Sequence, residues 1–265
     1  MTIQHVSSFG DGLRKWRQHR RLSQLDLALD AEVSQRHLSF VESGRASPSR
    51  EMVLRLTERL DLPLRDRNAL LLAAGYAPIF PERPLDDPAM GRALDAIRRL
   101  LKGHEPYPAL AVDRLWRMVA SNAAVAPLLA GVADAALLAP PVNVLRLSLH
   151  PGGLAPRIVN LPQWREHVLD RLRRQADAAA DGALLELLRE LESYAPPARP
   201  ARRRPAREEG PHWIVPLEIE TPAGVLSFIS TTTVFGAPMD VTLAEIAIEA
   251  FFPADDRTAQ ALRSG

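Results

Sequence analysis

The sequence predicts two domains of different fold class, an all-α domain of five helices followed by an α+β domain with an antiparallel sheet. Apolar residues at helical spacing, punctuated by N-cap serines, fill residues 9–75. Four prolines within residues 75–88 are typical of a linker. Helical segments then mix with alternating apolar positions, as strands require. We expect the domains at residues 1–78 and 107–258, with the linker and a connecting helix at 79–106.

Helix starts and stops are marked by particular side chains in the first domain. Ser23, with Asp26 three residues later, has the spacing of an N-cap and its capping box. Ser34 is the next N-cap, and Gly44 ends the helix that it opens, as a C′ glycine does. We expect helices near residues 13–21, 24–29, 35–43, 49–60 and 64–74.

The second domain is predicted to contain two strands, then helices, then three strands. Residues 109–112 and 116–120 form short apolar segments around a turn at Asp113-Arg114, and amphipathic helices are expected at 163–179 and 183–194. Residues 213–219 and 225–231 alternate as strands. Residues 246–252 alternate too, although a helix is an alternative there. This order resembles a PAS-like sensor domain, a curved antiparallel sheet with helices over one face.

Residues 24–29, 30–33 and 35–43 have the lengths of a helix, a tight turn and a recognition helix. In that geometry Gln24 meets a DNA phosphate, while the start of the second helix reaches base edges. Gln35 suits adenine and Arg36 suits guanine, because each pairs bidentately with that base. Eight Lys or Arg against five acidic residues in positions 9–50 fit a phosphate-contacting face. A helical bundle used only for protein contacts is the alternative.

This segment resembles the XRE family, the lambda/Cro-type helix-turn-helix regulators. The resemblance rests on LSQLDLA at 22–28, VS at 33–34, LS at 38–39, ESGR at 42–45 and PS at 48–49. It implies the five-helix Cro/C1-type fold and a structural ion pair between Arg17 and Glu42. The phosphate contacts that it implies are Gln24 and Ser43 to Arg45, and its base-reading positions are Gln35, Arg36, Ser39 and Phe40. Phe40 departs from the polar residue usual there, so it is expected either to contact a thymine methyl or to pack at the groove edge.

Three further segments resemble XRE regulators that carry an MmyB-type, PAS-like ligand-binding domain. They are AAGYAP at 73–78, DRLWRMVASN at 113–122 and IEAFFP at 248–253. The resemblance implies a pocket for a small, often fatty-acid-like effector. The candidate apolar walls are Trp116, Met118, Trp164, Trp213, Phe228 and Ile229, and the candidate polar contacts are Asn122, His150 and Thr231. Ordinary core packing of the aromatics, helix capping by Asn122 and a loop position for His150 are the alternatives.

Other classes of protein are disfavoured by what the sequence lacks. It has no Cys, so disulfides, thiolate metal sites and cysteine nucleophiles are excluded. It has no HExxH, no GxSxG and no GxxxxGK[ST], so we expect no catalytic residues, no metal, no cofactor and no enzyme activity. No apolar run of 18 residues or signal-peptide core is present, which predicts a cytoplasmic protein that does not enter a membrane.

Together these features predict a DNA-binding transcription regulator, acting as a homodimer on double-stranded operator DNA and controlled by a small apolar or fatty-acid-like effector. We expect the linker and the helix near 89–102 to transmit the signal. The alternative is a ligand-independent adaptor whose second domain mediates dimerisation or recruits a protein. Residues 195–211, with five prolines and five arginines, are expected to form a solvated loop, with a second nucleic-acid patch as the alternative.

Overall fold

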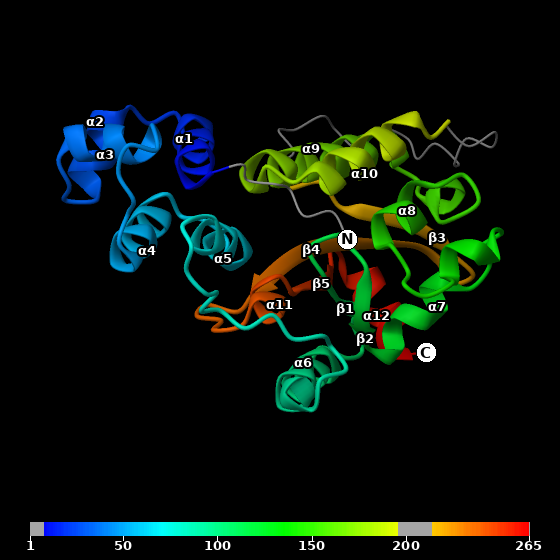
Figure 1. The fold of residues 1–265 in the computed structure, drawn as a ribbon. Helices are drawn as coiled ribbons and strands as arrows, with labels where there is room; N and C mark the ends of the chain where they lie inside the picture. The colour runs from blue at the N-terminus through cyan, green and yellow to red at the C-terminus, as the bar shows by residue number, and fades with distance from the viewer. Residues whose placement is uncertain (1–7, 196–213, 265) are drawn as a thin grey trace. The chain divides into compact units, whose positions relative to one another are not determined.

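The computed structural model describes residues 8–195 and 214–264, and the chain divides into two compact units (Figure 1). The first, called here the helical unit, consists of residues up to Arg83 together with Ala237–Ala244. The second, called the sheet unit, consists of Pro84–Gly236 and the residues from Glu245 onward. The two units are described separately below.

The helical unit confirms the predicted five-helix arrangement. Serine side chains accept a hydrogen bond from a first-turn backbone N–H at the starts of four helices, which fixes where each begins. The helices are α1 (Phe9–His19), α2 (Gln24–Asp30), α3 (Gln35–Glu42), α4 (Arg50–Arg59) and α5 (Leu64–Ala73). Leu13, Leu27, Leu38, Leu56 and Leu70 are each almost completely buried at its centre. A sixth, short helix, α11 (Val241–Ala244), comes from a distant part of the chain and contacts α5.

The sheet unit contains an antiparallel five-stranded sheet in the order β2-β1-β5-β4-β3. Its strands are β1 (Ala109–Val112), β2 (Met118–Ser121), β3 (Leu217–Thr221), β4 (Gly224–Val234) and β5 (Ala247–Pro253). Two strands therefore precede the helices and three follow them, as the PAS-like expectation requires. The segment for which a helix was the alternative is the strand β5.

The two faces of this sheet are set by the alternation of side chains along each strand. Register places Leu217 opposite Phe228, and Glu249 opposite both Leu110 and Thr232, so these five side chains share one face. Leu110, Leu217 and Phe228 on this face belong to a large apolar cluster. On the opposite face the ring of Phe252 lies against His104.

Helices α8 (Val144–Leu149), α9 (Leu161–Ala179) and α10 (Gly182–Ser193) supply the other side of that cluster. The helices α9 and α10 lie side by side along one side of the sheet (Figure 1). The remaining α-helices of the sheet unit are α6 (Gly91–Gly103), α7 (Ala126–Leu129) and α12 (Asp256–Ser264). Short 3-10 turns lie at Pro88–Met90, Ala123–Val125, Ala135–Leu138 and Ala155–Arg157.

The turn between β1 and β2 is longer than predicted, so β2 begins at Met118 and not at Trp116. The carboxylate of Asp113 accepts hydrogen bonds from the backbone N–H groups of Leu115 and Arg117, which closes the turn. Trp116 takes a φ of 63° inside it. Similarly, β3 begins at Leu217, later than the predicted strand, whose Trp213 lies outside the described residues.

The predicted solvated loop at 195–211 also lies, apart from residue 195, outside the described part of the chain. In the described ranges, no helix combines the length and the apolar character needed to cross a bilayer.

Candidate nucleic-acid interface and apolar cavity

The helices α2 and α3 form the two arms of a helix-turn-helix. Between them Glu32 has a φ of 54°, and the N–H of Val33 donates to the carbonyl of Ala28, which closes the turn. Ser34 then caps α3 through the N–H of His37. Gly44, with a φ of 73°, follows the last turn of α3, as its predicted C′ role requires.

Apart from Gln24, which is half-buried at the start of α2, the predicted base-reading and phosphate residues lie on the outer side of α3 and just after it. Gln35, Arg36, Ser43 and Arg45 are exposed, whereas Ser39 and Phe40 are half-buried. Spacings of four residues place 35, 39 and 43 on one face of the helix, next to 36 and 40. The opposite face carries the buried residues Leu38, Val41 and Glu42.

Phe40 organises two of the exposed cations. The guanidinium carbon of Arg36 lies 5.4 Å from the centre of the Phe40 ring, and that of Arg45 lies 5.9 Å from it. These are cation–π distances, and the contacts restrict where both guanidinium groups lie. The ring thus positions two charges on the surface that faces away from the helical core.

A buried ion pair holds α3 against α1. Arg17 Nε donates to Glu42 Oε1 at 2.6 Å, and its NH2 group donates to Oε2 at 2.9 Å. The Gln24 amide donates to the same carboxylate at 2.8 Å, which ties the start of α2 into the network. Burial by itself raises the pKa of Glu42, but hydrogen bonds from Arg17 and Gln24 and the charge of Arg14 lower it below its usual value.

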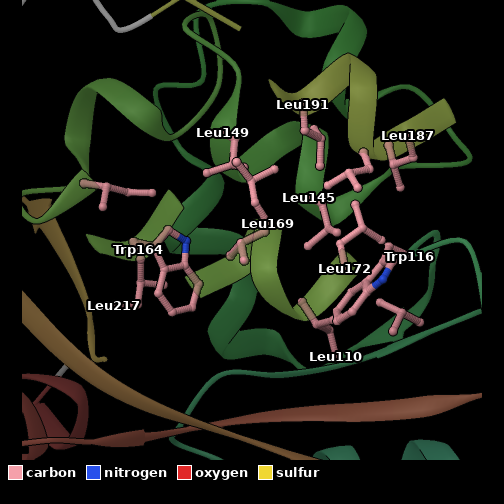
Figure 2. Packing of buried hydrophobic residues seen from close by; sticks show 14 of the residues in the cluster. Leu110, Trp116, Leu145, Leu149, Trp164, Leu169, Leu172, Leu187, Leu191 and Leu217 are labelled. Atoms are coloured by element: carbon pink, nitrogen blue, oxygen red, sulfur yellow. The ribbon is translucent and has the colours of Figure 1, made fainter. Parts of the chain in front are cut away.

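The sheet unit contains a partly open apolar cavity of about 110 Å³. Sixteen apolar and five polar residues line it, including three of the predicted wall residues, Trp116, Met118 and Trp164. Figure 2 shows the indole rings of Trp116 and Trp164 on either side of the apolar cluster, with leucines of α8 and α9 between them. The cavity thus lies within the core between the sheet and its covering helices.

The polar lining residues come from helices and strands alike. They are Ser148, His167, Arg171, Ser230 and Glu249. Trp164, His167, Val168 and Arg171 follow one another at helical spacing, so one face of α9 presents all four to the cavity.

Arg171 and Glu249 form a two-bond ion pair at the cavity wall. The distances are 3.0 Å from Arg171 NH1 to Glu249 Oε2 and 2.5 Å from NH2 to Oε1. The NH2 group also donates to the Thr232 hydroxyl at 2.6 Å, and the guanidinium lies 4.6 Å from the ring of Trp116. The side chain of Glu249 is only 5% exposed, so its charge depends on this partner.

His167 has a different environment. Its ring stacks on that of Trp164, with centroids 5.6 Å apart, and neither ring nitrogen forms a hydrogen bond with another of the described residues. Burial, then the charges of Arg171 and Arg174, lower the pKa of His167, which favours the neutral imidazole. A neutral imidazole has one N–H donor and one acceptor nitrogen to offer.

Several predicted effector contacts do not line the cavity. Asn122 uses its amide to join the carbonyls of Leu101 and Tyr107 to the N–H of Ala109, and it makes no side-chain cap to the following turn. His150 Nδ1 accepts from the N–H of Gly152.

The other predicted effector contacts do not line the cavity because of their burial or their position on the strand, or lie outside the described residues. Phe228 is fully buried and belongs to the cavity-side cluster without lining the space itself. Ile229 and Thr231 alternate with the cavity-side residues Ser230 and Thr232, so they face the other side of the sheet. Trp213 lies outside the described residues.

Sequence reasoning missed His167, Arg171 and Glu249. A signal was present in α9, because a His and an Arg recur at helical spacing with Trp164 and Val168 on an otherwise apolar face. A charge on an apolar face requires a partner. That partner lies 78 residues away, and no local pattern identifies it.

Comparison with known proteins gives matches to both parts of the chain. A family model described as the MmyB-like transcription regulator ligand binding domain matches residues 94–264, and a helix-turn-helix model matches residues 13–66. No curated protein matches the chain. Among solved structures, one described as an RNA-binding light-oxygen-voltage receptor is similar over 96% of this chain, with 14% identity and a TM-score of 0.27. This chain covers 63% of that receptor chain, and so low a TM-score supports no conclusion about function.

Proposed function

The chain belongs to the family of MmyB-like transcription regulators with an N-terminal helix-turn-helix, and from this premise we propose that a small apolar effector binds its cavity and changes its affinity for operator DNA. The DNA-binding and ligand-binding parts are thereby assigned to the helical unit and the sheet unit. We propose from the geometry the chemical class of the effector, and the residues that contact the effector and the DNA.

The single observation that carries the effector proposal is the cavity itself. Protein interiors are packed closely, and a void of about 110 Å³ in an apolar core forfeits packing contacts unless something fills it. A dry apolar cavity of roughly 150 Å³ suffices for a benzene-sized molecule. The present cavity is smaller than that, so a benzene-sized effector requires it to widen slightly and a longer fatty-acid-like chain requires it to widen further. The cavity therefore favours an effector-binding domain over an adaptor whose second domain binds no ligand.

For DNA, we propose that Gln35, Arg36, Ser39 and Phe40 face base edges, while Gln24, Ser43 and Arg45 contact phosphates. Exposure of the α3 surface and the placement of Arg36 and Arg45 around Phe40 support this division. Binding as a homodimer to paired half-sites follows from the way such helices read symmetric operators.

We further propose that the signal travels through residues 237–244 as well as through the linker that precedes α6. This segment connects β4 to β5 but packs within the helical unit. Arg83 donates to Asp240 at 2.8 Å, and the N–H of the fully buried Val241 donates to the carbonyl of Pro81 at 2.8 Å. The strand that follows, β5, carries Glu249 of the cavity wall. A shift of β5 on effector binding would thus act directly on a segment anchored in the DNA-binding unit.

The test begins with the operator and the copurified ligand. Selection of bound DNA fragments with the full chain should return a paired-half-site sequence, and native mass spectrometry followed by extraction should identify the bound molecule. Adding that molecule to stripped protein should change operator affinity by roughly 5-fold to 150-fold, the range of ordinary allosteric coupling. An operator affinity that stays the same at saturating ligand would rule out regulation by that molecule.

A further inference from the structure

We propose that the effector is an uncharged molecule with one hydrogen-bonding group, held by His167, and not a carboxylate or another anion. This inference rests on the proposed function, because it specifies the chemistry of the effector that the cavity takes. The inference is based on the charge and the hydrogen-bond partners of each polar group that lines the cavity.

Arg171 is the only arginine or lysine among the described residues that line the cavity, and its charge is already matched. Both of its terminal nitrogens donate to Glu249, one of them also donates to Thr232, and the guanidinium lies against the Trp116 ring. An effector carboxylate would have to displace Glu249 from this cation. The displaced carboxylate is 5% exposed and would keep only the hydrogen bond from the Thr232 hydroxyl, so a charge would remain in the core without its cation, which opposes the exchange.

The other polar lining groups carry no charge. Ser148 accepts a hydrogen bond from the indole N–H of Trp164, and Ser230 contributes a second hydroxyl. The ring of His167 stacks against that of Trp164, and its lowered pKa favours the neutral form. The cavity therefore offers a neutral donor and a neutral acceptor inside an apolar wall, which complements an alcohol, a ketone, an ester or an amide.

His167 is the group best placed to recognise such an effector. It forms no hydrogen bond with another of the described residues, whereas Ser148 already accepts one from Trp164. It also shares one helix face with Trp164, Val168 and Arg171, so a ligand bound to it lies among the apolar lining residues. His167 thus acts as the residue that sets specificity for the effector's polar group.

The test uses three probes with the same apolar body, benzyl alcohol, benzoate and toluene, on the full chain at pH 7.5. The indole N–H signals of Trp116 and Trp164, observed by NMR, report binding at the cavity. Benzyl alcohol should bind at least about tenfold more tightly than benzoate, because benzoate leaves either its own charge or that of Glu249 unpaired. Benzoate binding as tightly as benzyl alcohol would overturn the inference while leaving the ligand-binding function intact. Binding of none of the probes would overturn the inference, whereas the copurified molecule tests the ligand-binding function separately.

Two variants identify the residues responsible. His167→Phe should reduce benzyl alcohol affinity about tenfold and leave toluene unaffected, since only the hydrogen bond is lost. Glu249→Gln should raise benzoate affinity about tenfold, because it frees the Arg171 charge. The matched control is Glu190→Gln, which removes a carboxylate from the exposed pair with Arg146, outside the cavity, and should change no affinity.

An unchanged benzyl alcohol affinity in His167→Phe would contradict the assignment of this residue. The circular dichroism spectrum of each variant checks its folding. If Glu249→Gln fails to fold, the wild-type selectivity and the His167→Phe result still decide the proposal.

Discussion

Arg17 in α1 donates two hydrogen bonds to Glu42, the last residue of α3, across 25 residues of sequence, and the Glu42 side chain is completely buried. The pair connects the helix that begins the domain to the helix proposed to read DNA. Gln24 joins the same carboxylate, so three helices meet at one charged group. The orientation of α3 therefore depends on the buried charge of Glu42, which has its hydrogen-bond partners only when the three helices pack in this arrangement.

Replacing Arg17 should loosen α3. Arg17→Ala leaves Glu42 buried without its main partner, and breaking a buried pair in this way costs about 3–5 kcal/mol. Amide hydrogen exchange across residues 35–42 should accelerate, and operator binding should be lost with it. Arg98→Ala, which removes an exposed pair with Asp95, is the control and should change stability by less than about 1 kcal/mol. Unaltered exchange in α3 would mean that the ion pair does not hold the helix.

Arg36→Ala should distinguish base reading from phosphate binding. A bidentate contact to a base contributes about 1–3 kcal/mol of discrimination, so specific operator affinity should fall well beyond any loss on unrelated DNA. Fluorescence anisotropy with operator and scrambled duplexes at one salt concentration measures both. Equal losses on the two duplexes would place Arg36 at a phosphate instead.

Phe40→Leu should weaken operator binding more than a simple loss of contact area implies. The ring lies within cation–π distance of Arg36 and Arg45, and each such contact at an exposed site contributes about 0.5–1 kcal/mol. We expect about a tenfold weaker operator affinity in the same anisotropy assay, with the helical content preserved. In the Arg36→Ala background the effect should shrink, because one of the two contacts is already gone. Full additivity of the two substitutions would argue against positioning of Arg36 by the ring.

The helix-turn-helix could be predicted because its signals are local. Ser23 and Ser34 cap helices through residues three positions away, and Gly44 takes the left-handed conformation that its position demands. The order of strands and helices was also predictable from alternation and helical spacing. Short sequence patterns fix such elements since the interactions behind them span only a few residues.

The cavity could be predicted only in part. Trp116, Met118 and Trp164 line it, and their contact with an effector stays a prediction, but the ion pair of Arg171 and Glu249 joins residues 78 positions apart. Alternation along β4 predicts which residues share a face with Thr231, but it does not show which face of the sheet the helices cover. Register with β5 decides that point and turns Thr231 away from the cavity. Asn122, similarly, has its amide fully used by backbone groups that are distant in sequence.

The segment 237–244 should be required for the effector response. Asp240→Ala removes the partner of Arg83 and the acceptor for the N–H of Thr242, so the segment should detach from the helical unit more readily. Operator affinity and effector affinity should each change little when measured alone, while the effector-induced change in operator affinity falls several-fold. Glu82→Ala, which removes an exposed partner of Arg65, serves as the control. A full effector response in Asp240→Ala would show that the segment does not transmit the signal.

Stability should fall on mild acidification because of His167. Burial and the charges of Arg171 and Arg174 lower the pKa of its ring, so the unfolded chain binds more protons on this residue than the folded chain does. The free energy of unfolding should therefore decrease as the pH drops from 7.5 through the ordinary histidine pKa of about 6.5. Thermal unfolding at pH 7.5 and 5.5 should show a smaller decrease in His167→Gln than in the wild type. A decrease of the same size in both would assign the pH dependence to other groups.

The regulatory proposal is tested most directly by measuring operator affinity with and without the copurified effector. The measurement is made on the wild type and on a variant whose cavity is filled. Val168→Phe places a larger side chain at the cavity wall, and Val234→Phe makes the same change at an exposed position away from it. Wild type and Val234→Phe should show at least about a fivefold change in operator affinity on saturation with effector. Val168→Phe should bind the operator normally and show no change. An undiminished effector response in Val168→Phe would mean that the effector acts elsewhere and that the cavity does not control DNA binding.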